Sequence, residues 1–377
     1  MRLVSIAMIA AATLLGPAGS ANAAGPDRLW VFGDSTVDTG WYNFLPSGQS
    51  QFDQYLSSYN LARPRHFPPT YEMGKPTSSP GPVSVEVLAS LIGSELRPAD
   101  SPPVLQSFPV LELILGFPRP LLTGTNYATG GARNHDVNTP NSGFFPNAVP
   151  TETQIANYLS QHTPDRQSLY LISSGGNDVA FALSFSSNIA ADVTSAADSL
   201  AATIKTLQQR GAQYIIVTNL PESFGTADQQ TYRHLYNTEL QSQLTALGVS
   251  FAWGDMNSLR QQIVANPGAF GIAHTTNTLA DRACTTPDPA TGITSSWAYV
   301  CSPISPVSKP ISETFAEQAL FSDNEHWATG GHRILGTYYF CLAERTWPAL
   351  FFGTHTLPPI AVLPPPCGDR SILHAPS

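Results

Sequence analysis

Short, continuous apolar runs alternate with longer amphipathic stretches along most of the chain. Four such runs, RLWVFG, SLYLIS, QYIIVT and VSFAW, occupy residues 28–33, 168–173, 213–218 and 249–253. They are typical of strands buried on both faces of a parallel sheet, although periodicity by itself does not exclude buried helix. We therefore predict four buried strands.

The stretches between these runs have the spacing of amphipathic helices. The clearest spans residues 188–210, where apolar residues recur every three or four positions and Gly211 supplies a stop. Further helices are predicted around residues 82–96, 226–247 and 328–346. Alternating strands and helices indicate right-handed crossovers in a doubly wound α/β sheet, whose ligand sites lie beyond the carboxyl ends of the strands.

The first residues have the order of a secretory signal peptide. Arg2 precedes the apolar run LVSIAMIAAATLLG, and the small residues AGSANAA follow. We expect cleavage after Ala23, so that residues 1–23 are the signal peptide and residues 24–377 form a single domain with a proline-rich tail at about 354–377. No later stretch reads as a membrane span, and the protein is expected in the periplasm or the external medium.

Composition excludes some classes of function. The chain has 377 residues, a formal net charge of −9 and only 12% charged residues, which argues against a basic nucleic-acid-binding protein. No metal or cofactor is implied.

The cysteines are four in number: Cys284, Cys301, Cys341 and Cys367. An even number suits two disulfides in an oxidising compartment, and the lack of CxxC spacing argues against a zinc site. Three pairings are open. We predict Cys284–Cys301 and Cys341–Cys367, because partners that are near in sequence close the smaller loops.

The first predicted strand leads into VFGDSTVDTG, residues 31–40, where Ser35 has two interpretations. Ser35 with Asp38 three residues later matches a helix capping box, in which the serine side chain satisfies a backbone N–H group. Alternatively, Ser35 is a nucleophile, since it follows a strand at the edge where such sheets bind ligands. This stretch alone favours the cap.

Near the C-terminus, SDNEHWATGGHR places Asp323 and His326 three residues apart, a spacing that would bring both side chains to one face of a helical turn. A carboxylate in that position fixes the tautomer of an imidazole and stabilises the imidazolium that forms when it accepts a serine proton. The alternative is the first turn of a helix with incidental polar residues.

Two glycine-rich stretches offer donors for an oxyanion. In ISSGGNDVA, which follows the second predicted strand, the Asn177 amide is a neutral donor at the same sheet edge as Ser35. In NYATGGARNHD, Gly131 could present its backbone N–H group where no Cβ blocks close approach. Each stretch is also consistent with an ordinary turn.

Together these four stretches resemble, in order, the sequence blocks of the GDSL esterases and lipases, also called SGNH hydrolases. The matching stretches are GDS, NYATGGA, GGND and DNEHWATGGH. The resemblance implies that Ser35 is the nucleophile, Asp323 the orienting acid and His326 the base. It also implies an oxyanion hole formed by Gly131, Asn177 and the backbone N–H group of Ser35.

The resemblance covers residues from about 28 to 345 and implies the SGNH hydrolase fold. That fold is a three-layer α/β/α sandwich with a flavodoxin-like, mainly parallel sheet of about five strands. Three residues depart from the family pattern: Thr36 replaces leucine, Trp327 replaces the proline after the histidine, and His274 replaces asparagine. We expect Trp327 to affect the substrate pocket, His332 to be structural, and His135 and His274 at most to line the cleft.

The implied function is that of a secreted serine esterase or lipase that hydrolyses acyl esters through an acyl-enzyme. A lipid acyltransferase or phospholipase with the same triad is one alternative, and a carbohydrate acetylesterase is a second. A binding protein on an inactive hydrolase fold would need a broken block, and all four blocks are intact. The oligomeric state is left open.

The stretch between Gly40 and Gly81 lacks periodicity and is rich in aromatic residues. Most of these rings are expected to pack within the stretch itself, and some should face Ser35. An aromatic wall with few charges favours uncharged acyl chains over a sugar, so we expect small-molecule or lipid esters with short to medium acyl chains.

Overall fold

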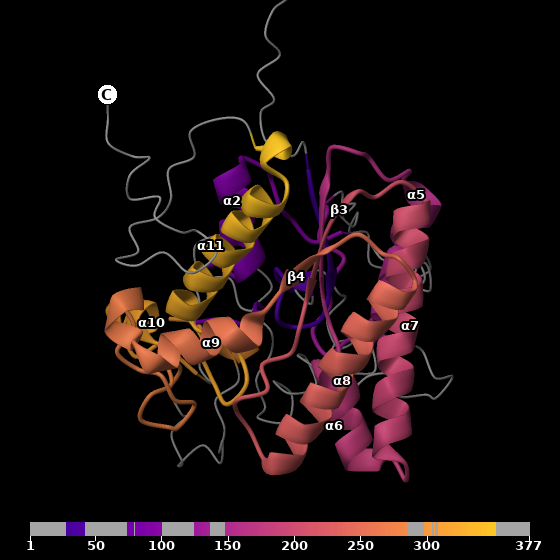
Figure 1. Cartoon of the computed structure of the whole chain (residues 1–377). Coiled ribbons are helices and arrows are strands. Elements are labelled where there is room, and N and C mark those ends of the chain that lie inside the picture. Colours follow the sequence, from indigo (N-terminus) through magenta and orange to yellow (C-terminus); the bar gives the residue numbers. More distant parts are fainter. Residues whose placement is uncertain are drawn as a thin grey trace, which may run out of the picture.

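The structure is a computed structural model. It describes residues 28–41, 74–78, 80–99, 124–135, 148–285, 298–303, 305 and 308–351. Within these ranges a parallel sheet lies between two layers of helices (Figure 1). The predicted signal peptide, the proline-rich tail and residues 42–73 of the aromatic stretch lie outside the described residues.

The sheet contains four parallel strands in the order β1-β2-β3-β4. Their bounds are Leu29–Gly33, Leu169–Ser173, Tyr214–Thr218 and Ala252–Gly254. The first three coincide with predicted runs, whereas β4 begins three residues later than its run. The reason is that Val249 closes the turn that ends the preceding helix, since its N–H group donates to the Leu244 carbonyl at 2.9 Å.

A further segment pairs with the outer edge of β1. Val31 donates its N–H group to the Thr125 carbonyl at 3.0 Å and accepts from the N–H group of Tyr127 at 2.8 Å. Thr129 then donates to the Gly33 carbonyl at 3.1 Å. We expected a sheet of about five strands. The described residues form four strands, and this parallel, strand-like segment lies in the fifth position.

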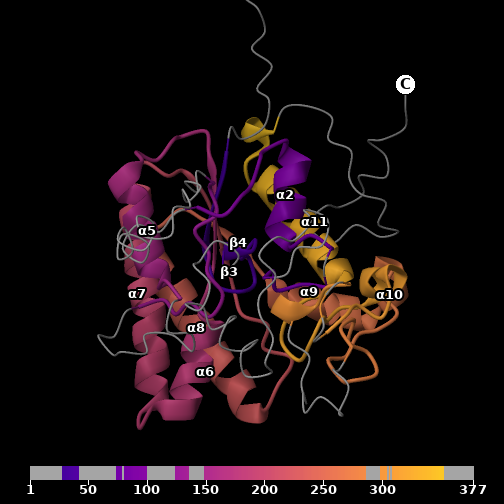
Figure 2. The ribbon, with the colours of Figure 1, turned by 180° about the vertical axis from the view of Figure 1, so that it is seen from behind.

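Helices cover both faces of the sheet, as the views from two sides show (Figure 2). On one face lie α5, α6, α7 and α8, with bounds Thr151–Gln161, Gly176–Phe185, Ile189–Gln209 and Ala227–Ala246. On the other lie α2 (Ser84–Ile92), α9 (Met256–Ala265) and α11 (Thr329–Thr346), with α10 (Glu313–Gln318) against α11. None of the described helices is long and apolar enough to cross a membrane.

Alternate residues of each strand belong to two separate cores. Val31 and Leu171 pack with α2, α9 and α11, whereas Phe32 and Ile172 pack with α5 to α8. All four side chains are fully buried. This two-sided burial explains why the strands read as continuous apolar runs rather than as alternating ones.

The four predicted helices are confirmed as α2, α7, α8 and α11, but the described residues contain four further α-helices that were not predicted. Helix α6 begins in the glycine-rich stretch GGND, for which the sequence suggests an oxyanion donor or an ordinary turn but no helix. Helices α9 and α10 are short, and each has a cap that the sequence could have signalled. The Asp255 side chain accepts from the Ser258 N–H group, and the Ser312 side chain accepts from that of Phe315.

The predicted disulfide between Cys284 and Cys301 is present. The second predicted pairing, Cys341–Cys367, involves Cys367, which lies outside the described residues, so this pairing stays a prediction.

Candidate active site

Ser35 lies in a turn directly after β1 and not at the start of a helix. Asp34 Oδ1 accepts from the N–H group of Thr36 at 2.9 Å, and Asp38 Oδ1 accepts from that of Gly40 at 2.8 Å. The interpretation of Ser35 and Asp38 as a capping box is therefore wrong. Two aspartates, rather than the serine, satisfy the backbone N–H groups that the turn exposes.

Asp323 and His326 meet in the loop that precedes α11. Asp323 Oδ2 lies 2.8 Å from His326 Nδ1, and Asp323 Oδ1 accepts from the backbone N–H group of His326 at 2.7 Å. Residues 322–326 are bends, so the expected helical turn is wrong. The side chains still meet because the Asp323 carboxylate accepts hydrogen bonds both from the backbone of the loop and from the imidazole, which holds the loop in a bend.

The loop that carries this pair is closed at its base by Phe321 and Trp327, which form an antiparallel bridge. Ser322 donates its N–H group to the His326 carbonyl at 2.8 Å and its hydroxyl to the Trp327 carbonyl at 2.9 Å. The Trp327 residue is only 5% exposed and belongs to the core beneath α11. Its structural contribution is to anchor the Asp323–His326 loop in the core.

Burial and charge act in opposite directions on the pKa of His326. Burial lowers this pKa, but the adjacent carboxylate of Asp323 outweighs burial and raises it above 6.5. Burial correspondingly raises the pKa of Asp323, yet His326 and the N–H donors hold it below 3.8. Asp34 also contributes to the raised pKa of His326, which places the turn after β1 within electrostatic range of the imidazole.

Gly131 and Asn177 are neighbours at the carboxyl edge of the sheet. Asn177 lies in the first turn of α6, and its Nδ2 donates to the Ala132 carbonyl at 3.0 Å. Gly131 has a φ of +79°, a conformation that residues with a Cβ rarely adopt. The backbone hydrogen bond from Thr129 to Gly33 fixes the segment before Gly131 to the end of β1. The two expected oxyanion donors therefore lie beside the strand that leads to Ser35.

The start of α6 also lies against the turn that holds Ser35. A Cβ placed on Gly176 would be 3.8 Å from Asp34 Oδ2. Ser35 follows Asp34, and Asn177 follows Gly176 in the chain. Together with the electrostatic contact between Asp34 and His326, this brings the sequence-predicted site residues to one edge of the sheet.

Two buried aspartates adjoin these residues and were assigned no role from the sequence. Burial raises the pKa of Asp34 to about 6. Burial raises the pKa of Asp178 to about 7, although Arg133, whose Nε lies 3.6 Å from Asp178 Oδ1, opposes the rise. Asp178 also accepts from the N–H group of Asn134 at 2.9 Å. The only feature of the sequence that could have pointed to them is their position, because Asp34 precedes Ser35 and Asp178 follows Asn177.

His332 is buried and structural, as expected. Its Nδ1 accepts from the N–H group of Ser84 at 3.0 Å, and its Nε2 lies 3.2 Å from the Pro76 carbonyl. Burial lowers the pKa of His332 to about 3, so the ring is neutral. It joins the start of α2 to α11.

His135 and His274 each face a carboxylate of their own. His135 Nδ1 lies 2.8 Å from Glu152 Oε2, and His274 Nδ1 lies 3.4 Å from Asp281 Oδ1. The His274 ring also stacks on Phe315, with centroids 3.9 Å apart. Among the residues that the structure describes, no group of three or more His, Cys, Asp or Glu could hold a metal ion.

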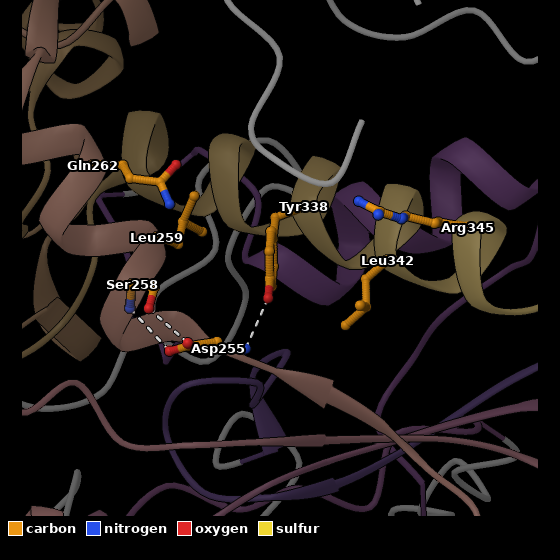
Figure 3. A pocket seen from close by; sticks show the side chains of 7 residues that line it. All are labelled: Asp255, Ser258, Leu259, Gln262, Tyr338, Leu342 and Arg345. Carbon is orange, nitrogen blue, oxygen red and sulfur yellow. Dashed lines mark hydrogen bonds between the residues drawn. The ribbon is translucent and has the colours of Figure 1, made fainter. Parts of the chain in front are cut away.

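A surface pocket lies apart from these residues, between α9 and α11 (Figure 3). Its lining consists of Asp255, Ser258, Leu259, Gln262, Tyr338, Leu342 and Arg345. The Asp255 carboxylate accepts from Ser258, and the Asp255 N–H group donates to the Tyr338 hydroxyl at 2.8 Å. None of the sequence-predicted site residues lines this pocket, so we do not assign the catalytic chemistry to it.

The sequence model of one family, described as GDSL-like Lipase/Acylhydrolase, matches residues 29–337. The chain belongs to this family. The matched range contains every block on which the resemblance was based, from the serine turn to the Asp323–His326 loop. Family membership and the parallel sheet agree on an α/β fold of the SGNH hydrolase type.

Individual relatives of this GDSL-family chain are distant in sequence. Esterase EstA of Pseudomonas aeruginosa is 25% identical over 366 residues, which cover 90% of this chain and 50% of the relative. An uncharacterized protein in the trpE-trpG intergenic region of Pseudomonas putida is 25% identical over 338 residues, covering 84% and 48%. A GDSL esterase/lipase of Arabidopsis thaliana is 25% identical over 288 residues, covering 66% and 72%. The chain thus spans about half the length of the Pseudomonas relatives.

Proposed function

We propose that this protein is a serine esterase or lipase that hydrolyses carboxylic esters through an acyl-enzyme on Ser35. The observation that carries the proposal is the buried Asp323–His326 pair, 2.8 Å apart, at the sheet edge where the turn of Ser35 lies. Ester hydrolysis is the chemistry for which an oriented imidazole beside a serine is suited. Membership in a lipase and acylhydrolase family supports the same conclusion.

In the proposed reaction, Ser35 Oγ attacks the ester carbonyl carbon while His326 Nε2 accepts the hydroxyl proton. Asp323 holds the Nδ1–H group and stabilises the imidazolium. The imidazolium then protonates the departing alcohol, which leaves Ser35 acylated. In the second half, His326 removes a proton from water, the hydroxide attacks the acyl carbon, and the proton returns to Ser35 as the acid is released.

Three donors would stabilise the tetrahedral oxyanion in both halves: the backbone N–H groups of Ser35 and Gly131 and the side-chain amide of Asn177. One N–H of Asn177 is engaged by the Ala132 carbonyl at 3.0 Å. That bond fixes the plane of the amide, so that its second N–H is pre-oriented before substrate binds. Pre-oriented donors of this kind are a large source of rate enhancement.

Replacing Asn177 with alanine tests the oxyanion role. We expect kcat to fall by about 10²-fold or more, the usual effect of removing one oxyanion donor. The measurement is kcat and KM on a chromogenic butyrate ester. A change confined to KM would instead indicate a substrate contact, and an unchanged kcat would remove Asn177 from the oxyanion hole.

Secretion is part of the proposal and depends on the signal-peptide pattern that ends near Ala23. Residues 24–377 would then be a single hydrolase domain. N-terminal sequencing of the protein recovered from its native host checks the cleavage site.

For the acyl group we propose an uncharged chain of short to medium length. Asn177, Phe181 and Phe185 recur every four residues along α6, so they follow one side of the helix away from the oxyanion donor. The two rings are 5.0 Å apart, and Phe185 is 69% exposed. The Arg133 guanidinium lies over the Phe181 ring, 3.9 Å from its centroid, and Phe185 extends this side of α6 with an exposed apolar ring. An exposed apolar ring in this position favours an alkyl chain over an acetylated sugar.

A series of chromogenic esters from acetate to octanoate, with acetylated xylan beside it, tests this substrate class. We expect Phe185→Ser to lower kcat/KM for octanoate by about tenfold while acetate changes little, since less apolar area is buried. Leu279→Ser is the matched control, because Leu279 is also 62% exposed but lies in a loop after α9. Turnover of the acetylated glycan alone would contradict the acyl preference and favour a carbohydrate acetylesterase.

An acyltransferase or phospholipase with the same triad is the second candidate. It would pass the acyl group to an alcohol other than water, or take it from a phospholipid. Product analysis with an added alcohol, and with phospholipid in place of the chromogenic ester, separates these activities from simple hydrolysis.

The Cys284–Cys301 disulfide lies beside the loop that carries the acid and base. The Cys284 N–H group donates to the Ser322 carbonyl at 3.1 Å. In the double variant Cys284→Ser, Cys301→Ser we expect kcat to fall about tenfold at temperatures where the sheet is intact, because small displacements at a reacting centre have large effects. The measurement compares kcat with circular dichroism during heating. Equal activity and equal melting in the variant would show that the disulfide has no such role.

A further inference from the structure

Tyr299, which the sequence did not mark, connects separate parts of the site. It lies in the 3-10 turn η4, Ala298–Val300, and is 1% exposed. Its ring meets the His326 imidazole nearly at a right angle, with the centroids 5.7 Å apart and an interplanar angle of 87°. Edge-to-face contact of this kind orients a ring without sharing its hydrogen bonds.

The hydroxyl of Tyr299 reaches the turn that holds Ser35. It donates to Asp38 Oδ2 at 3.3 Å, and the same oxygen accepts from the Gly130 N–H group at 2.9 Å. A Cβ placed on Gly130 would lie 1.7 Å from the tyrosine oxygen, so only glycine lets the hydroxyl sit against this main chain. The phenol therefore lies where the serine turn and the Gly131 loop meet.

The backbone of the same turn holds the acid. The Ala298 N–H group donates to Asp323 Oδ2 at 2.7 Å, and this is also the oxygen nearest His326 Nδ1. Three residues after Ala298, Cys301 is bonded to Cys284, whose N–H group donates to the Ser322 carbonyl. The turn η4 thus contacts Asp323 through its backbone and His326 through the tyrosine ring, and the disulfide links the segment after it to Cys284, which is hydrogen-bonded to the same loop.

We propose that Tyr299 is a positioning residue that sets the His326 imidazole relative to Ser35 and the oxyanion donors. It does so by joining Asp38, Gly130 and His326 through one rigid side chain. The inference rests on the proposed function, because it concerns the alignment of the same acid, base and nucleophile. A displacement of about 1 Å in such an alignment can reduce a rate about 10²-fold.

Two variants separate the hydroxyl from the ring. We expect Tyr299→Phe to lower kcat about fivefold, through the loss of one hydrogen bond to a carboxylate. Tyr299→Leu, which also removes the contact with His326, should lower kcat by about 10²-fold. KM for a butyrate ester should stay within about twofold of wild type in both, because the change acts on alignment rather than on substrate binding.

The matched controls are Tyr158→Phe and Tyr158→Leu. Tyr158 is fully buried, its hydroxyl lies 3.2 Å from that of Tyr170, and its ring packs on Trp30 near the amino end of β1. These variants should lower the melting temperature and leave kcat unchanged. A kcat within twofold of wild type in Tyr299→Leu, or a loss that appears in KM alone, overturns the proposal.

A second measurement tests the proposal even if Tyr299→Leu fails to fold or the protein shows no esterase activity. The hydrogen bond between His326 Nδ1 and Asp323 Oδ2 should give a downfield resonance in proton NMR, which is recorded without substrate. We expect this resonance to shift or broaden in Tyr299→Phe and to stay unchanged in Tyr158→Phe, and an unchanged resonance in both overturns the proposal. An Asp323→Asn variant with full activity would contradict the proposed function instead, so the two failures are distinguishable.

Discussion

Replacing Ser35 with alanine should abolish ester hydrolysis, with kcat lower by about 10⁵-fold or more, because the covalent step has no other nucleophile. The fold should persist, since the turn is held by Asp34 and Asp38 rather than by the serine side chain. The measurement is turnover of a butyrate ester together with the melting temperature.

Ser160→Ala is the matched control for this variant. The Ser160 hydroxyl donates to the Asn157 carbonyl within α5, away from the predicted site residues, so its loss should leave turnover unchanged. Turnover near that of wild type in Ser35→Ala would remove Ser35 from the mechanism, whatever the state of the fold.

Asp323→Asn should lower kcat by about 10⁴-fold, because an amide that donates toward Nδ1 favours the tautomer that cannot accept the serine proton at Nε2. The remaining amide oxygen can still accept from the backbone N–H groups of His326 and Glu325, whereas the Ala298 N–H group loses its acceptor Oδ2. The measurement is kcat on the butyrate ester at saturating substrate.

The same variant should change the pH profile in a defined direction. The base works as neutral imidazole, and Asp323 raises the pKa of His326, so wild-type kcat/KM rises as pH increases through that raised pKa. Without the carboxylate charge the pKa falls, and the ascending limb of the residual activity should move to lower pH.

Asp281→Asn supplies the control for both effects, because Asp281 faces His274 at 3.4 Å in a similar pair outside the site. Its rate and its profile should match wild type. An ascending limb that stays in place in Asp323→Asn would show that another group, and not His326, governs the pH dependence.

Local pattern alone determined much of the fold and part of the site. The strands at 28–33 and 168–173 were readable because residues buried on both faces leave a continuous apolar run. The helix of residues 188–210 was readable from its apolar spacing and its glycine stop. The Cys284–Cys301 bond followed from the small loop that it closes. These features depend on residues close together in the chain.

Tertiary structure decided how the same residues are used. Ser35 and Asp38 fit a helix cap equally well by spacing, but a cap needs a helix, and the chain after β1 turns instead. Asp323 and His326 fit a helical turn by spacing, yet a carboxylate that accepts from two backbone N–H groups of its own loop stabilises a bend.

The contacts of Tyr299 could not be predicted from any local sequence pattern. Its partners Asp38 and His326 lie 261 and 27 positions away in the chain, and Gly130 admits its hydroxyl only because it has no Cβ. A spacing rule reports which side chains can share a face of one element. Which donor finally meets which acceptor depends on how distant segments pack, because buried polar groups pair with whatever partner the fold brings to them.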